Sequence, residues 1–267
     1  MAYLELLRNC RLSSSAVMII CLALGLCGCS AIDPQKAETS PVSHEIFDEL
    51  LARHVDKQGY LDYEGVMTDR AKLRRYLTLI TQNPPNDQQW SSSEKLAYWI
   101  NLYNAFTIEL VLDYYPVASI KDIGSSIQVP FVNTPWDIKM IEIDGKKYDL
   151  NNVEHNILRK IFDEPRIHFA INCASASCPK LRREAYRADI IDRQLHEQTI
   201  DFINDPERND ITTRPAQISK LFQWWKGDFT RDGTVREYIN QYAAEPLEEG
   251  ADIDYLEYDW SINKAGS

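Results

Sequence analysis

Basic residues are in the minority in this sequence: 29 lysines and arginines stand against 40 aspartates and glutamates, which gives a formal net charge of −11. A chain of this charge repels a phosphate backbone, so we expect no nucleic-acid partner. The sequence also has no internal repeat, no glycine-rich phosphate loop and no zinc-type cysteine spacing. These absences exclude a repeat protein, a phosphate-loop nucleotide site and a structural zinc site, and we expect no metal and no cofactor.

Long hydrophobic runs are scarce as well. The longest, from Ala16 to Leu26, has about eleven residues and is too short to span a bilayer. It follows Arg8 and Arg11, as the core of a secretory signal does. The run ends in the letters LCGCS, which resemble a bacterial lipobox with Cys29 as the acylated cysteine and Ser30 as an outer-membrane sorting signal.

The amino terminus therefore predicts a lipoprotein with three parts before its domain begins. We expect residues 1–28 to be the signal peptide and residues 29–42 to be a lipidated tether. Cys29 would carry the lipid anchor and join the protein to a membrane. The predicted location is the bacterial cell envelope, at the outer membrane and facing the periplasm.

Cysteine is the next scarce residue, because processing and lipidation remove four of the six. The mature chain keeps only Cys173 and Cys178, both within the segment 166–179, RIHFAINCASASCP. Ile167, Phe169 and Ile171 alternate with smaller or polar residues, which predicts a strand that runs into a loop holding both cysteines. A thiol, an amide and an imidazole at one strand end are typical of a site with chemistry.

Hydrophobic periodicity predicts the remaining elements of a single α+β domain over residues 43–263, with a short tail at 264–267. A long central helix begins after the capping box of Ser91 and Glu94, with Ser93 as an alternative cap, and stops before Pro116. Asp144 and Gly145 predict the tight turn of a hairpin. The other expected elements are helices over 43–54, 70–81, 151–162, 189–202 and 235–242, a hairpin over 138–150, and a closing strand over 253–260.

The central helix carries two asparagines, Asn101 and Asn104, among apolar neighbours. A buried amide without a partner costs about 1–3 kcal/mol, so both must form hydrogen bonds. We favour bonds to adjacent backbone that lock a loop; lining a polar cleft is the alternative. The helix itself is expected to be buried against a small mixed or antiparallel sheet.

Several of these segments resemble, in order, the successive motifs of the domain of unknown function 547 (DUF547) family, over roughly residues 44–263. The motifs are SSSEKLAYWINLYNAFTI, LNNVEHNILR, DEPRIHFAINCASASCP, LFQWWKGDF and YLEYDWSIN. The resemblance implies a topology similar to that of papain and transglutaminase-like cysteine hydrolases, with a rearranged catalytic order. It matches the family's helix histidine to His155, its cysteine motif to Asn172 and Cys173, and its helix residues to Glu94, Asn101 and Asn104.

One hypothesis is therefore a cysteine-dependent hydrolase or acyl transferase acting on peptide or amide bonds. Cys173 would attack the acyl carbon as a thiolate. His155 or His168 would be its base, with His155 preferred because it lies at the edge of a helix stripe. Glu94 or an asparagine would orient the imidazole, and Asn172 or a loop N–H would stabilise the oxyanion.

The second hypothesis is a non-catalytic binding or scaffold lipoprotein. Two cysteines five residues apart in an exported protein commonly form a disulfide, which silences the thiol. The aromatic-rich segment 222–229 would then contact a peptide, a glycan or a protein ligand, with Arg166, Asn101 and Asn104 as candidate binding residues. A third hypothesis is redox or metal work by the cysteines and His168. The sequence favours no particular oligomeric state.

Overall fold

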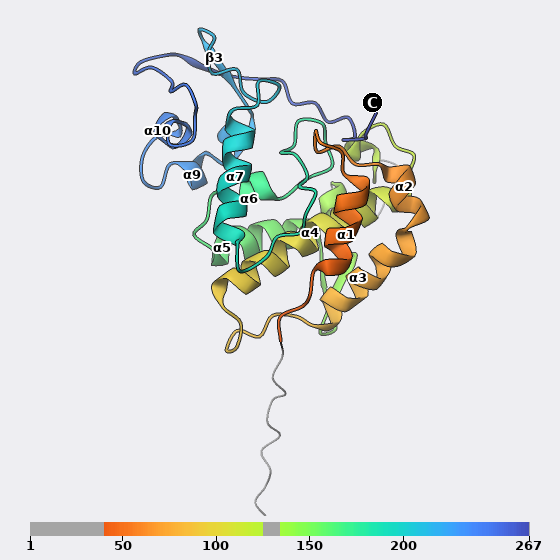
Figure 1. The fold of residues 1–267 in the computed structure, drawn as a ribbon. Coiled ribbons are helices and arrows are strands. Elements are labelled where there is room, and N and C mark those ends of the chain that lie inside the picture. The colour runs from red at the N-terminus through yellow and green to blue at the C-terminus, as the bar shows by residue number, and fades with distance from the viewer. Residues whose placement is uncertain (1–39, 125–133, 267) are drawn as a thin grey trace, which may run out of the picture. The chain divides into compact units, whose positions relative to one another are not determined.

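The computed structural model describes residues 40–124 and 134–266 of the chain. The predicted signal peptide, Cys29 and most of the predicted tether lie outside the described residues. The described residues belong to one unit that extends over 39–267. Figure 1 shows its arrangement, with α1, α2 and α3 gathered at one side of α4 and α7, α9 and α10 at the other.

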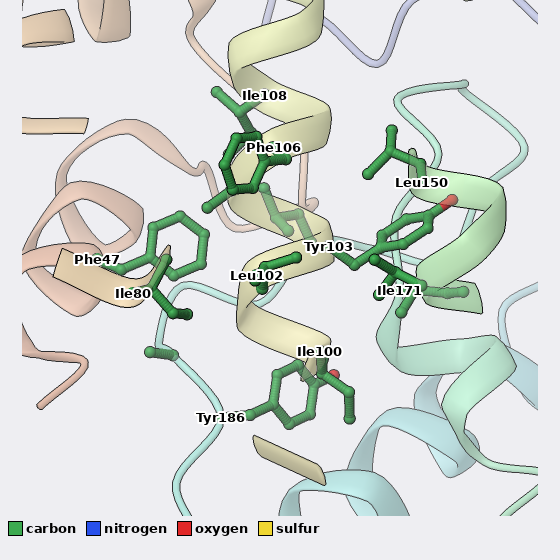
Figure 2. Close-up of a cluster of buried hydrophobic side chains, with 14 of the residues drawn as sticks. Phe47, Ile80, Ile100, Leu102, Tyr103, Phe106, Ile108, Leu150, Ile171 and Tyr186 are labelled. Atoms are coloured by element: carbon green, nitrogen blue, oxygen red, sulfur yellow. The ribbon is translucent and has the colours of Figure 1, made fainter. Parts of the chain in front are cut away.

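The central element is α4, Ser92–Tyr114, whose side chains are buried along most of its length. It begins at the predicted capping box: the Ser91 N–H donates to Glu94 Oε2 over 2.7 Å, and the Glu94 N–H donates to Ser91 Oγ over 3.2 Å. The chain leaves the helix at Tyr115, directly before Pro116, which cannot continue it. Figure 2 shows apolar side chains around α4, with Phe47 and Ile80 on one side and Leu150 and Ile171 on the other.

The amino-terminal helices cover one side of α4. They are α1 (Glu45–His54), α2 (Tyr63–Thr68) and α3 (Arg70–Gln82). The predicted helices over 43–54 and 70–81 are confirmed, because the apolar stripe of each faces the core. The buried side chains of α1, α2 and α3 belong to the same cluster as those of α4. These three helices therefore complete the core on this side of α4.

The strands are short and form two separate two-stranded sheets. β1 (Ile141–Ile143) and β2 (Lys146–Tyr148) form the predicted antiparallel hairpin. Its two turn residues have positive φ angles, 50° at Asp144 and 71° at Gly145, as a primed turn requires. β3 (Ala216–Ile218) pairs in parallel with β4 (Ile253–Tyr255), which falls within the predicted closing strand. The chain is thus a single α+β domain, and α4 packs mainly against α3 and η3 (Asn152–Leu158).

The strand predicted at residues 167–171 is wrong, because Ile167–Ala170 form the short helix α6. The apolar alternation there has another cause: α6 lies between two clusters of buried side chains. Ile167 packs in the cluster around α4, and Phe169 packs in a second cluster of aromatic rings. Every side chain of α6 is buried, so its period-two pattern does not mark a buried face and an exposed face.

The second cluster lies in the carboxyl-terminal half, where α7 (Ile191–Ile203) confirms the helix predicted at 189–202. Phe169 stacks on Phe202 and Phe229 with ring centroids 4.8 and 5.5 Å away. The cluster also draws on α8 (Leu221–Trp224), α9 (Lys226–Phe229) and α10 (Val235–Asn240). Within the described ranges, no helix combines the length and apolar character needed to cross a membrane.

Candidate functional site

A pocket of about 200 Å³ opens where the cysteine loop meets the carboxyl-terminal segment. Its wall comes from segments far apart in the sequence, including α4, the helix η3, the loop after α6, and α8. Figure 2 shows one of these wall residues, Tyr103, pointing from α4 toward Leu150 and Ile171. The lining residues are Tyr103, Trp136, Asn151, Glu154, His155, His168, Ile171, Cys173, Cys178, Pro179, Leu221, Trp224, Trp225, Tyr258 and Trp260.

Hydrogen bonds of the buried residue Asn172 hold the cysteine loop in place. The Asn172 N–H donates to Asn104 Oδ1 over 2.8 Å, and its Nδ2 donates to the Pro179 carbonyl over 2.8 Å. Its own side-chain oxygen accepts from the Ala174 N–H over 2.8 Å, next to the positive φ of 64° at Ala174. Asn172 is therefore occupied with loop backbone, and these bonds fix where both cysteines point.

Cys173 and Cys178 form a disulfide, with their Cα atoms 6.2 Å apart. The sulfurs lie in a polar setting: Tyr258 Oη is 3.4 Å from Cys173 Sγ and 3.5 Å from Cys178 Sγ. Ser175 Oγ lies 3.2 Å from Cys173 Sγ, and the Cys173 N–H donates to Cys178 Sγ over 2.9 Å. A sulfur in a disulfide carries no thiolate, so in this state Cys173 is not a nucleophile.

His168 on α6 is buried and is held by a carboxylate. Its Nε2 lies 2.8 Å from Asp228 Oδ2, and Arg159 Nε donates to the same oxygen over 2.6 Å. Burial lowers the pKa of His168. Hydrogen bonds from His168 and Arg159 hold the pKa of Asp228 far below its usual range. His168 also stacks on Trp225 with planes 6° apart, so its ring is fixed on two sides.

The π-helix η3 places Glu154 and His155 in the pocket wall. Such helices are rare and frequently occur at functional sites, because the wider turn moves side chains out of α-helical register. Burial raises the pKa of Glu154 to about 7, against the opposing effects of Arg159 and the Tyr103 hydroxyl. Burial also lowers the pKa of His155, and the positive charge of Arg159 adds to that effect.

Aromatic rings form another part of the pocket wall, the aromatic wall, made of Trp136, Trp224, Trp225, Tyr258 and Trp260. Trp224 stacks on Trp260 with centroids 5.6 Å apart, and Tyr258 contacts both rings at 4.8 and 4.5 Å. Trp136 joins the same group, 5.9 Å from Trp260. Trp224 is 40% exposed, although a tryptophan is usually buried, so this group presents an aromatic face to solvent at the pocket mouth.

The pocket brings together four of the predicted site residues, Cys173, Cys178, His155 and His168. The others lie elsewhere. Glu94 caps α4, and Arg166 bonds to Glu164 and Asp192. As favoured from the sequence, both central-helix asparagines bond to backbone: Asn101 to the carbonyl and the N–H of Tyr186, and Asn104 to the Ala170 carbonyl and the Asn172 N–H.

Glu154, Asp228 and most of the aromatic wall were not predicted from the sequence. One available signal was tryptophan itself, since four of the six tryptophans in the chain line this pocket. The segment 222–229 was expected to make contacts and supplies Trp224 and Trp225. Trp136, Tyr258 and Trp260 were not assigned a role. Asp228 carries no local signal, because its partner His168 lies sixty residues earlier.

Metal ligands do not gather in the part of the chain that the structure describes. No group of three or more histidine, cysteine, aspartate or glutamate side chains there has an arrangement that could hold a metal ion. The groups that line the pocket are the disulfide, the two imidazoles, the Glu154 carboxyl and the aromatic rings.

The chain was compared with protein families, curated proteins and solved structures. No curated protein and no solved structure matches the chain. A family model described as "Protein of unknown function, DUF547" matches residues 88–203, which include α4, η3 and the cysteine loop. The resembling motifs at 221–229 and 255–263, which supply much of the aromatic wall, lie beyond the matched residues. The segment 88–203 is therefore a DUF547 region.

Proposed function

We propose that the chain is a ligand-binding lipoprotein of the bacterial cell envelope, anchored through Cys29 at the outer membrane and facing the periplasm. The anchor rests on the sequence, through the apolar run 16–26 and the lipobox-like letters that follow it. The pocket between η3 and the aromatic wall is the proposed binding site. The disulfide has a structural role there, because it fixes the loop that forms one side of the pocket.

The observation that carries this proposal is the Cys173–Cys178 disulfide in the pocket wall. A cysteine hydrolase needs a free thiolate, which a disulfide removes. The periplasm is an oxidising compartment in which disulfides persist, so the proposed location and the disulfide support each other. Concave, mostly apolar pockets with a few polar groups are also the usual form of a ligand site.

A second candidate is the cysteine hydrolase in a reduced form of the protein. One observation favours it: Cys173 shares the pocket with both histidines, and Asp228 orients His168 as a catalytic base would require. This function requires a dithiol reductant to open the disulfide once, before catalysis begins, because acyl transfer itself returns the free thiol at each turnover. The two candidates therefore differ in the redox state of the protein as it exists in the cell.

The test is the redox state of Cys173 and Cys178 in protein isolated from the envelope without reductant. Thiols are alkylated across a pH series, before and after reduction, and read by peptide mass spectrometry. We expect both cysteines to resist alkylation until reductant is added. The same measurement on His155→Ala and His168→Ala variants serves as a control, and we expect neither change to expose a thiol.

The opposite result would contradict the binding proposal and support the hydrolase. It consists of a free Cys173 thiol that alkylates well below the pH of an ordinary thiol and loses this reactivity in one histidine variant. Such a result would identify the nucleophile and its base together.

A further inference from the structure

We infer that the ligand is an uncharged saccharide, one ring of which enters the pocket between the aromatic wall and the helix η3. This inference rests on the proposed binding function and names its ligand class. Three features carry it: the charge of the pocket, its exposed ring faces, and two polar atoms without partners.

The pocket presents little net charge. Its imidazoles, His155 and His168, both have a lowered pKa and are neutral at pH 7. The carboxyl of Glu154 is buried and has a pKa of about 7, so it is only partly ionised at pH 7, and the Arg159 guanidinium is paired with Asp228. An anionic ligand would find no unpaired cation there, and a cationic ligand would find no fully ionised carboxylate, so a neutral ligand fits best.

Cations already cover two of the aromatic faces. Lys121 Nζ lies 3.9 Å from the centroid of the Trp260 ring, and the Arg159 guanidinium lies 4.4 Å from that of Trp225. Aromatic cages for quaternary ammonium ligands depend on those same negative ring faces. These two cations therefore disfavour a cationic ligand, whereas the C–H groups of a sugar ring can pack on the exposed face of Trp224.

Two polar atoms in the wall have no hydrogen-bond partner among the described residues. They are Trp136 Nε1, which can only donate, and His155 Nδ1, which donates or accepts according to its tautomer. Both atoms are buried, and both residues line the pocket. Sugar hydroxyls donate and accept together, so neighbouring hydroxyls of one ring can satisfy both atoms.

A peptide ligand fits less well. Extended peptides are commonly bound by pairing with a strand edge, yet the wall of this pocket consists of helices and loops and includes no residue of β1–β4. The pocket volume, about 200 Å³, is also below the roughly 300–1,000 Å³ of sites that bury a drug-sized ligand, which suits a single ring.

Isothermal titration calorimetry on the full lipidated chain tests the inference. The protein is held in a polyoxyethylene detergent, because sugar-headed detergents would compete for the site. The probes are a panel of neutral oligosaccharides with glucose, galactose, mannose and N-acetylglucosamine units. Choline and an uncharged tetrapeptide are the comparison ligands. We expect saturable binding of at least one oligosaccharide and none of choline or the tetrapeptide.

Variants connect binding to the pocket. Trp224→Ala removes an exposed ring and should weaken the affinity about ten-fold, the order of one aromatic contact. Trp136→Phe keeps the ring but removes the donor, and should weaken it about five-fold. Trp99→Phe, on α4 and outside the pocket, is the matched control and should leave the affinity within about two-fold.

Failure of this inference is distinct from failure of the proposed function. The saccharide inference would be refuted if only choline or the tetrapeptide bound, or if neither pocket variant weakened saccharide binding. Either result would leave the proposed binding function, with its intact disulfide, in place. The absence of any saccharide binding would overturn the saccharide inference too. A free and reactive Cys173 would instead reject the binding function itself.

Discussion

Glu154 is a glutamate whose environment differs sharply from that of an exposed carboxyl group. It is buried in the wall of the pocket, and burial raises its pKa to about 7. Three groups from other elements face it: Tyr103 from α4, Arg159 from α5 (Arg159–Ile161), and Asp228 from α9. Since the pKa is raised, the folded state binds a proton that the unfolded state releases between about pH 4.5 and 7.

Glu154 therefore contributes full stability below pH 4.5, and this contribution is lost as the pH rises through 7. Glu154→Gln keeps the shape of the protonated carboxyl but never ionises. We expect the variant to gain stability relative to wild type by about 3 kcal/mol between pH 4.5 and pH 8. The measurement is urea unfolding of both proteins across this range.

The histidines are present in both proteins, so their titration cancels in this difference. Glu142→Gln, which changes an exposed glutamate of β1, is the control and should show no such trend. A stability difference between wild type and Glu154→Gln that is constant with pH would refute the assignment.

At the residue scale, the sequence predicted hydrogen bonds that follow from the residues next to a polar group in the chain. Asn101 and Asn104 had to bond because they were surrounded by apolar residues, and they do. It could not predict that Asp228 would hold His168 or that Tyr258 would meet the disulfide, because those contacts form only when distant segments pack. The pocket's histidines and cysteines were predicted, but their partners were not.

At the scale of elements, the start of α4 offers a direct test of a predicted cap. Ser91 and Glu94 form the capping box, while Ser93, the alternative cap, lies inside the helix. Ser91→Ala removes the acceptor of the Glu94 N–H, and we expect a loss of about 1 kcal/mol of unfolding free energy. Thermal and urea unfolding provide the measurement.

Ser93→Ala is the matched change two residues along. It should alter the stability by no more than about 0.5 kcal/mol, since alanine is a better helix former than serine and no cap is lost. Equal losses in the two variants would mean that the helix start is not fixed by the capping box.

Elements with a single buried face were predictable, and so was the long helix α4 from its cap and its length, whereas the short helix α6, which is buried on all sides, was not. The stripes of α1, α3 and α7 and the Asp144–Gly145 turn are local signals, and each gave the correct element. In α6, however, Ile167 and Phe169 enter different clusters, so their alternation reflects tertiary packing. The π-helical form of η3 likewise has no periodicity that a helix prediction would separate from an α-helix.

At the scale of the whole molecule, the matched family segment is smaller than the folding unit. Residues 88–203 hold α4 and the cysteine loop, but α4 is covered by α1 and α3 from residues 45–82. On the other side, Phe169 and Phe202 pack against Phe222 and Phe229, which follow the segment. Both clusters are therefore incomplete within the segment, and so is the pocket, which needs Trp224 and Trp260.

We therefore predict that a fragment of residues 88–203 does not fold cooperatively, whereas a fragment of residues 40–266 does. The short fragment would expose the faces of α4 and α6 that neighbours cover in the full domain, and too little apolar surface would be buried to offset the chain entropy. The measurements are near-ultraviolet circular dichroism, urea unfolding and limited proteolysis of both fragments, each purified with its disulfide oxidised. We expect a sharp unfolding transition and protease resistance only for the longer fragment. A sharp transition in the short fragment would show that the flanking helices and aromatic rings are additions to a self-sufficient core, and the pocket would then have to be regarded as a feature of the flanks rather than of the fold.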